Sequence, residues 1–313
     1  MINKINYRFD SNSKLILLFT ILTFALITLY SGEVLTKNFL STFTCLFLIL
    51  TVGVSHGALD DIKGYKVLKF YKVKNKIVFY LSYISSALLV IFIWILFPTI
   101  ALTLFLTIAA YHFGKEDSWS LTIKKSNLNS IKFFLKGSLI ILAPLWLSFE
   151  ETILIFNTLG VKNQEFYNFL GFLSFNKLFL LLVLLSILSN ILISRELKHL
   201  TGFAWEIICI LALYEAFNPL VAFTIYFCFS HSLKHMVSLK HEFNINIQKF
   251  IKKAFPLTLL TSILFFFGIY ILTRFQNVPV DSSIINVIFI GLASLTFPHI
   301  LLEYLLEKNE KKS

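Results

Sequence analysis

Two histidines four residues apart, His231 and His235, are the strongest chemical signal in the sequence. They lie in the segment Phe-Ser-His-Ser-Leu-Lys-His at 229–235, at the end of an apolar run that begins near Asn218. In a helix, residues four apart share a face, so the two imidazoles project side by side and can bind one metal ion. Taken alone, the pair is equally compatible with rings that hydrogen-bond to neighbouring side chains or to lipid headgroups.

Three further histidines lie near the ends of other apolar runs. They are His56 in Ser-His-Gly-Ala-Leu-Asp (55–60), His112 in Tyr-His-Phe-Gly-Lys-Glu-Asp (111–117) and His299 in Pro-His (298–299). On the topology developed below, the five histidines come from four helices and share roughly one depth. Polar groups at such positions are costly and usually face the interior of a bundle. We therefore expect their side chains to converge.

Four of these imidazoles suit a transition-metal site. Neutral imidazoles from three helices satisfy a first-row metal, and an all-nitrogen site with a vacant position suits ferrous iron, Fe(2+), that must bind dioxygen. We expect the metal ligands, and thus the catalytic residues, to be His56, His112, His231 and His235.

Carboxylates close to these histidines are candidates for orienting them. Asp60 lies one turn beyond His56, and Asp117 lies five residues beyond His112. Such carboxylates can accept the second ring N–H of a ligand and fix its tautomer. The alternative for each is a solvated residue at a helix end. Glu206, deeper in an apolar run, is either a proton relay or a buried structural acid.

Two other residues are candidates for the substrate pocket. His299 is a fifth ligand, a donor to the ligands or a pocket residue, because Pro298 loosens the helix ladder and lets the ring point inward. Tyr111 is one of several aromatic residues that can line an apolar tunnel. In a chain with 35 phenylalanines, however, most aromatic residues belong to the core or face lipid.

The composition indicates a multi-span membrane protein. Of the 313 residues, 57% are hydrophobic and only 14% are charged, which is more apolar surface than a soluble domain of this size can bury. The net charge of +11 does not indicate nucleic-acid binding, because the basic residues fall between the apolar runs. Three cysteines inside these runs, without paired spacing, predict neither disulfides nor a cysteine metal site.

The apolar runs predict an all-α, polytopic transmembrane bundle that forms a single integral-membrane domain over residues 1–313. Each run is long enough to cross the hydrocarbon core of a bilayer. The predicted spans are about 15–30, 39–56, 77–97, 98–113, 131–149, 177–194, 201–216, 218–238, 255–274 and 283–306.

The distribution of charge predicts the topology. With the N-terminus inside, all but four of the 28 basic residues fall in segments assigned to the cytoplasm. The exceptions are Lys37, Lys162, Lys177 and Arg274. Ten spans with both termini cytoplasmic, in the cell inner membrane, are favoured, and eight are possible if one weak hairpin does not cross. The longest outer connection, 150–176, is a candidate re-entrant segment.

Four motifs in order, at 55–60, 111–117, 231–235 and 298–299, resemble those of the Brp/Blh family of β-carotene 15,15'-dioxygenases. The resemblance extends from the second to the tenth predicted span. It implies cleavage of the central double bond of β-carotene by O2 to give two all-trans-retinal, with ferrous iron held by His56, His112, His231 and His235. It also implies that the retinal supplies a microbial rhodopsin.

Other function classes remain open from the residues themselves. A membrane di-iron hydroxylase or desaturase also clusters histidines at helix ends, but it needs about eight ligands and this chain has seven histidines. A transporter can use histidines as a proton relay, and His56 and His112 can serve as axial ligands of a haem. Metal stoichiometry, oxygen consumption and a Soret band separate these classes.

Overall fold

The computed structural model describes residues 2–34, 41–57, 59–118, 128–194 and 197–310, with side chains for all of these except 2–10, 56, 193–194 and 197–199. Every regular element in these ranges is helical, which confirms the predicted all-α class. The elements are α1 (Ile2–Ser31), α2 (Thr42–Leu48), the π-helical η1 (Ile49–Gly53), the 3₁₀ turn η2 (Val54–Gly57), α3 (Asp60–Phe70), α4 (Ile77–Leu96), α5 (Pro98–Glu116), α6 (Asn129–Leu147), α7 (Phe149–Thr158), α8 (Gln164–Phe175), α9 (Leu178–Ser194), α10 (Leu197–Ala216), α11 (Pro219–Tyr226), the π-helical η3 (Phe227–Ser232), α12 (Leu233–Glu242), α13 (Ile247–Phe275) and α14 (Val280–Glu310).

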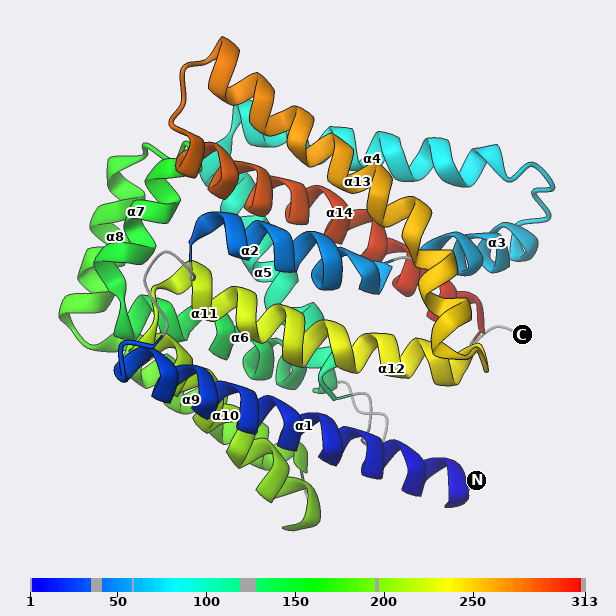
Figure 1. The fold of residues 1–313 in the computed structure, drawn as a ribbon, viewed down its shortest axis with the longest axis horizontal. Helices are drawn as coiled ribbons and strands as arrows, with labels where there is room; N and C mark the ends of the chain where they lie inside the picture. The colour runs from blue at the N-terminus through cyan, green and yellow to red at the C-terminus, as the bar shows by residue number, and fades with distance from the viewer. Residues whose placement is uncertain (1, 35–40, 58, 119–127, 195–196, 311–313) are drawn as a thin grey trace.

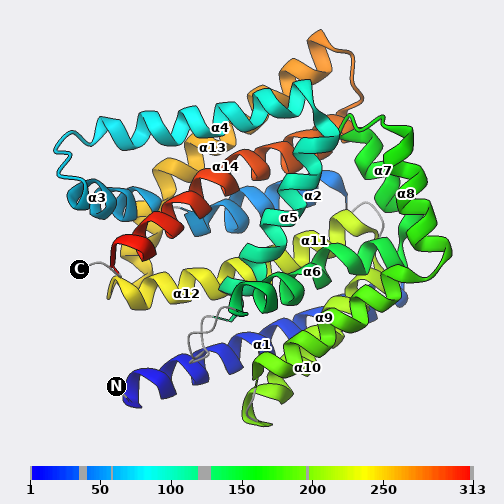
Figure 2. The same cartoon turned by 180° about the vertical axis from the view of Figure 1, so that it is seen from behind.

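The long helices form one bundle in which both ends of the chain lie at the same end (Figures 1 and 2). Helix α14 packs against α3, α4 and α13, while α6 packs against both α5 and α9. The short helices α7 and α8 lie at the other end of the bundle (Figure 1). These two helices account for most of the 150–176 connection.

All ten segments predicted as spans are helical over most of their length. Within the described ranges, five helices are long and apolar enough to cross a membrane: α1, α4, α6, α13 and α14. A sixth crossing results if α8 and α9, which are bent by 73° at their junction, act as one span. The count of ten spans and the cytoplasmic side of the termini stay predictions.

Proline and asparagine residues mark the starts of α5 and α11. Pro98 is the first residue of α5, and Pro219 is the first residue of α11, where a missing N–H costs nothing. The side chain of Asn218 caps α11 by accepting a hydrogen bond from the Val221 amide at 3.0 Å. Downstream of this cap, η3 widens the helix around His231, and π-helical turns of this kind are frequent at functional sites.

Helices α5 and α6 approach each other at two glycines. A methyl group on Gly137 would overlap the Ala110 carbonyl oxygen and lie 2.5 Å from the Gly114 nitrogen. A methyl group on Gly114 would overlap the Phe133 carbonyl oxygen. Small residues allow this kind of close backbone approach between membrane helices. The contact fixes the end of α5 that carries His112.

Three lysines that the charge analysis assigned to cytoplasmic segments between spans are in fact buried. Lys63, Lys136 and Lys234 are exposed by 3%, 6% and 1%, respectively. Each of these lysines contacts an oxygen atom of another segment, as described below. Their positions therefore depend on packing within the bundle and do not only indicate topology. The three cysteines are free and buried, as expected from their spacing.

Candidate metal centre

Four histidine rings cluster in the interior of the bundle. The His112 ring, from α5, lies 5.3 Å from the His231 ring of η3 and 5.3 Å from the His299 ring of α14, measured between ring centres. The His235 ring of α12 lies 5.5 Å from the His299 ring. Each of the four residues is at most 4% exposed. Segments far apart in the sequence therefore bring four imidazoles to one place.

Three of the four rings contact a carboxylate through Nδ1. The pairs are His231 with Asp117 Oδ1 at 3.2 Å, His235 with Glu116 Oε2 at 2.8 Å, and His299 with both oxygens of Asp60 at 2.9 Å. A histidine that donates Nδ1–H to a carboxylate is held in the tautomer that offers Nε2 to a metal. The Nε2 atoms of all four histidines are buried. This set of nitrogen donors fits a divalent first-row metal such as Fe(2+).

The geometry shows where three of the four predicted ligands lie, and their binding of a metal stays a prediction. The structure brings His112, His231 and His235 together around His299, which the sequence left as a fifth ligand, a donor or a pocket residue. The backbone of His56 lies in η2. Its side chain lies outside the described residues, so its role as a ligand stays a prediction.

Asp60 and Asp117 contact histidines that lie on other helices. Asp60 was expected to act on His56 of its own segment, but its described partner is His299 of α14. Asp117 was expected to act on His112, but it contacts His231 of η3. Both carboxylates are buried, at 4% and 5% exposure, and are not the solvated helix-end residues of the alternative interpretation.

Asp117 takes part in several hydrogen bonds of a buried polar network. The Tyr226 hydroxyl donates to its Oδ2 at 2.7 Å. Lys136 donates to the Asp117 carbonyl oxygen and to Ser118 Oγ, both at 3.0 Å, and its ammonium lies 4.1 Å from the centre of the Phe203 ring. The Tyr226 hydroxyl therefore holds the Asp117 carboxylate, and Lys136 holds the backbone of the same residue, so the His231 ring is kept in one orientation.

Glu206 and Tyr111 contact residues other than the four histidines. Glu206 is buried, forms an ion pair with Lys234 and accepts a hydrogen bond from Ser230 Oγ at 3.1 Å, which favours the structural acid over the proton relay. Tyr111 is half-buried, and its ring contacts Phe133 of α6 at 6.4 Å. Neither residue is among the described residues that line the cavity below.

A cavity of about 1250 Å³ reaches the histidine cluster. Its walls are mainly apolar side chains of α4, α13 and α14, and the side chains of His299, Asp60 and Tyr83 lie in its lining. The Tyr83 hydroxyl donates to Asp60 Oδ2 at 2.9 Å. Along α14 the lining runs from Ser282 to His299, a rise of about 25 Å. The cavity therefore has room for a long apolar molecule beside His299.

Sequence reasoning missed Glu303, Lys63, Tyr83 and the contact of Glu116 with His235. Glu303 had a detectable signal, because it follows His299 by four residues on one apolar helix. It pairs with Lys63 of α3. Burial lowers the pKa of Lys63, but the Glu303 and Asp60 carboxylates outweigh this effect and raise the pKa above its usual value. Lys63 is therefore a buried cation beside the centre.

Comparisons with known proteins agree with the motifs. The sequence model of a family described as Beta-carotene 15,15'-dioxygenase matches residues 47–307. A curated relative, a beta-carotene 15,15'-dioxygenase from uncultured marine bacterium 66A03, is 26% identical over 260 residues, which cover 82% of this chain and 90% of that protein. No solved structure matches the chain.

Proposed function

The chain belongs to the β-carotene 15,15'-dioxygenase family, and we propose that it is an iron-dependent membrane oxygenase that cleaves the central double bond of β-carotene. The products are two molecules of all-trans-retinal, and O2 is the second substrate. Membership confirms the resemblance seen in the four motifs and makes the chain an enzyme. The iron, the retinal product and its use by a microbial rhodopsin are the proposed parts.

The observation that carries the proposal is the meeting of an apolar cavity with a buried imidazole cluster. A long hydrocarbon has no polar group to fix its position, so its register must come from the shape of the site. The cavity passes His299, Asp60 and Tyr83. A polyene lying along α14 would then present one double bond to the centre.

The residues of the centre have separate tasks. His112, His231, His235 and the predicted ligand His56 would hold ferrous iron, with His299 beside them. When bound, iron supplies the activation of dioxygen that an organic side chain cannot provide. Asp117 and Glu116 orient their histidines through Nδ1. The burial of the cluster excludes water, which protects a reactive centre from side reactions.

We further propose that the bundle crosses the cell inner membrane ten times as a single domain, with both termini in the cytoplasm. The position of both chain ends at one end of the bundle supports an even number of crossings (Figures 1 and 2). In this setting β-carotene enters from the bilayer without passing through water, and retinal leaves by the same apolar route towards a rhodopsin.

The test is retinal formation in a bacterial host that makes β-carotene. We expect the wild-type chain to convert carotene to retinal, measured by chromatography of cell extracts. A His231→Ala/His235→Ala variant of equal abundance should form none, because it removes two of the four clustered imidazoles. Aldehydes of other lengths would refute central cleavage, and intact carotene beside a folded, iron-loaded wild type would refute carotene cleavage altogether.

Narrowing the cavity should reduce turnover without disturbing the centre. Ala87 of α4 lines the cavity, so Ala87→Phe places a ring in the path of the polyene. We expect retinal formation to fall about 10-fold or more, because misplaced substrate reacts slowly. Iron per chain should not change. The matched control is Ser85→Phe on the same helix, which is exposed and outside the cavity lining. Equal activity of the two variants would contradict the proposal that this cavity holds the substrate.

A further inference from the structure

Helix α14 carries a carboxylate on the same face as the histidine that borders the cavity. His299 and Glu303 are four residues apart, so their side chains leave the helix in one direction. Glu303 is largely buried, with 15% of its side chain exposed. A carboxylate in this position needs an electrostatic reason, because burial without compensation is costly.

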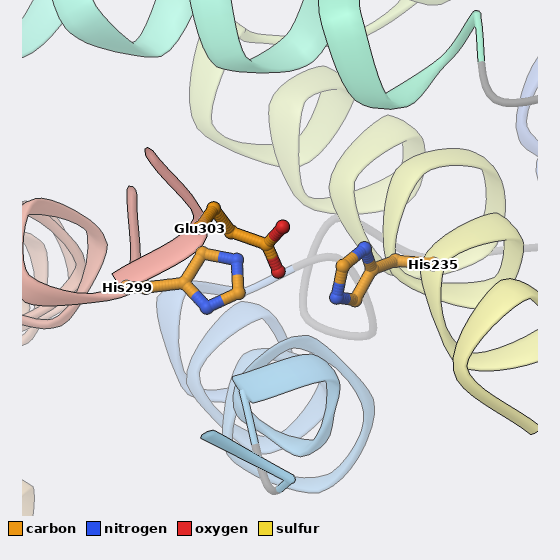
Figure 3. Close-up of side chains that lie close together, drawn as sticks. All are labelled: His235, His299 and Glu303. Carbon is orange, nitrogen blue, oxygen red and sulfur yellow. The ribbon is translucent and has the colours of Figure 1, made fainter. Parts of the chain in front are cut away.

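The Glu303 carboxylate lies between two imidazoles. Figure 3 shows it pointing into the space between His299 and His235. One ligand atom from each of these three residues lies within 4.8 Å of the other two, so a single ion can contact all three after small side-chain rotations. Two histidines and one carboxylate are the ligand set that non-haem ferrous oxygenases use, and this set leaves other positions open.

The ion pair with Lys63 does not occupy the whole carboxylate. Glu303 uses Oε1 towards the Lys63 ammonium. An ionised carboxylate has two oxygens and about four lone-pair sites, so Oε2 can bind a metal while Oε1 stays on the lysine. Lys63 then has the role of a positioning residue, because it holds the carboxylate of Glu303 in place.

We propose that Glu303 is a ligand of the metal centre and binds the same ion as His235 and His299. This inference rests on the proposed metal dependence and revises the ligand set, because the expected ligands were histidines alone. With His235, His299 and Glu303 as ligands, not all of the other expected histidines can bind the ion if a position is to stay open for dioxygen. It places a carboxylate ligand on α14, the helix that also lines the substrate cavity. The centre then carries one negative ligand, which lowers the net charge that the ion brings into the bundle.

The experiment measures metal binding directly with Co(2+), whose visible absorption reports its ligands. The full-length protein is purified in detergent, stripped of metal with a chelator and titrated with Co(2+). We expect Glu303→Gln to lower Co(2+) affinity by at least about 100-fold and to change the absorption spectrum. The matched control is Glu307→Gln, one turn further along α14, where the carboxylate is 43% exposed and pairs with Lys115. It should bind Co(2+) like the wild type.

A double variant separates a ligand from a partner of Lys63. Lys63→Met/Glu303→Gln removes both charges of the ion pair, and Asp60 keeps its contacts with His299 and Tyr83, so the variant should fold. If Glu303 only neutralises Lys63, this variant regains wild-type Co(2+) affinity and spectrum, and the inference fails. If Glu303 is a ligand, the Co(2+) affinity and the absorption spectrum of the double variant both stay altered.

The outcome is independent of the reaction. If the wild type forms retinal and the Glu303→Gln variant binds Co(2+) normally, the assignment of Glu303 as a ligand is wrong and the proposed function is unaffected. A wild type that forms no retinal, together with a variant that loses Co(2+) binding, supports the ligand and refutes the reaction.

Discussion

Replacing Gly137 by alanine is expected to remove most of the folded protein. The added methyl group would overlap the Ala110 carbonyl oxygen and crowd the Gly114 nitrogen, so two helix backbones must separate. This is more severe than ordinary overpacking, which costs about 1–3 kcal/mol, because backbone atoms cannot rotate away. The shift would also move the end of α5 that carries His112, Glu116 and Asp117. The measurement is the yield of monodisperse protein in detergent and its iron content per chain.

The control for this prediction is another helical glycine with open space around it. A Cβ on Gly171 of α8 meets no heavy atom within 4 Å. Gly171→Ala should therefore keep the wild-type yield and gain up to about 1 kcal/mol from the higher helix propensity of alanine. If Gly137→Ala and Gly171→Ala gave the same yield and the same iron content, the close packing of α5 on α6 would not matter for the site.

Replacing Lys234 by methionine is expected to be the most damaging loss of a single charge. Lys234 is 1% exposed and forms an ion pair with Glu206, which is 4% exposed. Breaking a buried pair leaves an uncompensated charge and costs about 3–5 kcal/mol. Lys234 lies next to His235, so the same change should also reduce iron retention. Thermal unfolding of the purified protein should begin roughly 10 °C lower.

Two comparison variants test the electrostatic cause. Lys66→Met breaks the exposed Lys66–Glu242 pair, whose side chains are 42% and 41% exposed, and should cost less than about 1 kcal/mol. Lys234→Met/Glu206→Gln removes both buried charges and should recover much of the lost stability. A double variant as unstable as Lys234→Met would mean that packing of the lysine stem, not its charge, matters.

The sequence by itself determined the all-α class of the fold and the family to which the chain belongs. The apolar runs were sufficient to predict the helices, because hydrophobic patterns act within a few residues. The histidine motifs were sufficient to identify the family and to indicate a metal. The position of each histidine near the end of an apolar run leads us to expect that their side chains converge, and the structure brings His112, His231 and His235 together.

Only the tertiary structure decided which groups meet. Asp60 contacts His299 across 239 positions of the chain, and Glu116 contacts His235 across 119. Helical periodicity shows which residues share a face, but not how far each helix is rotated against its neighbours. That rotation is set by contacts between helices, such as the crossing at Gly114 and Gly137. For the same reason, the burial of Lys63 and Lys234, the cavity along α14 and the place of Glu303 between two imidazoles required the packed bundle.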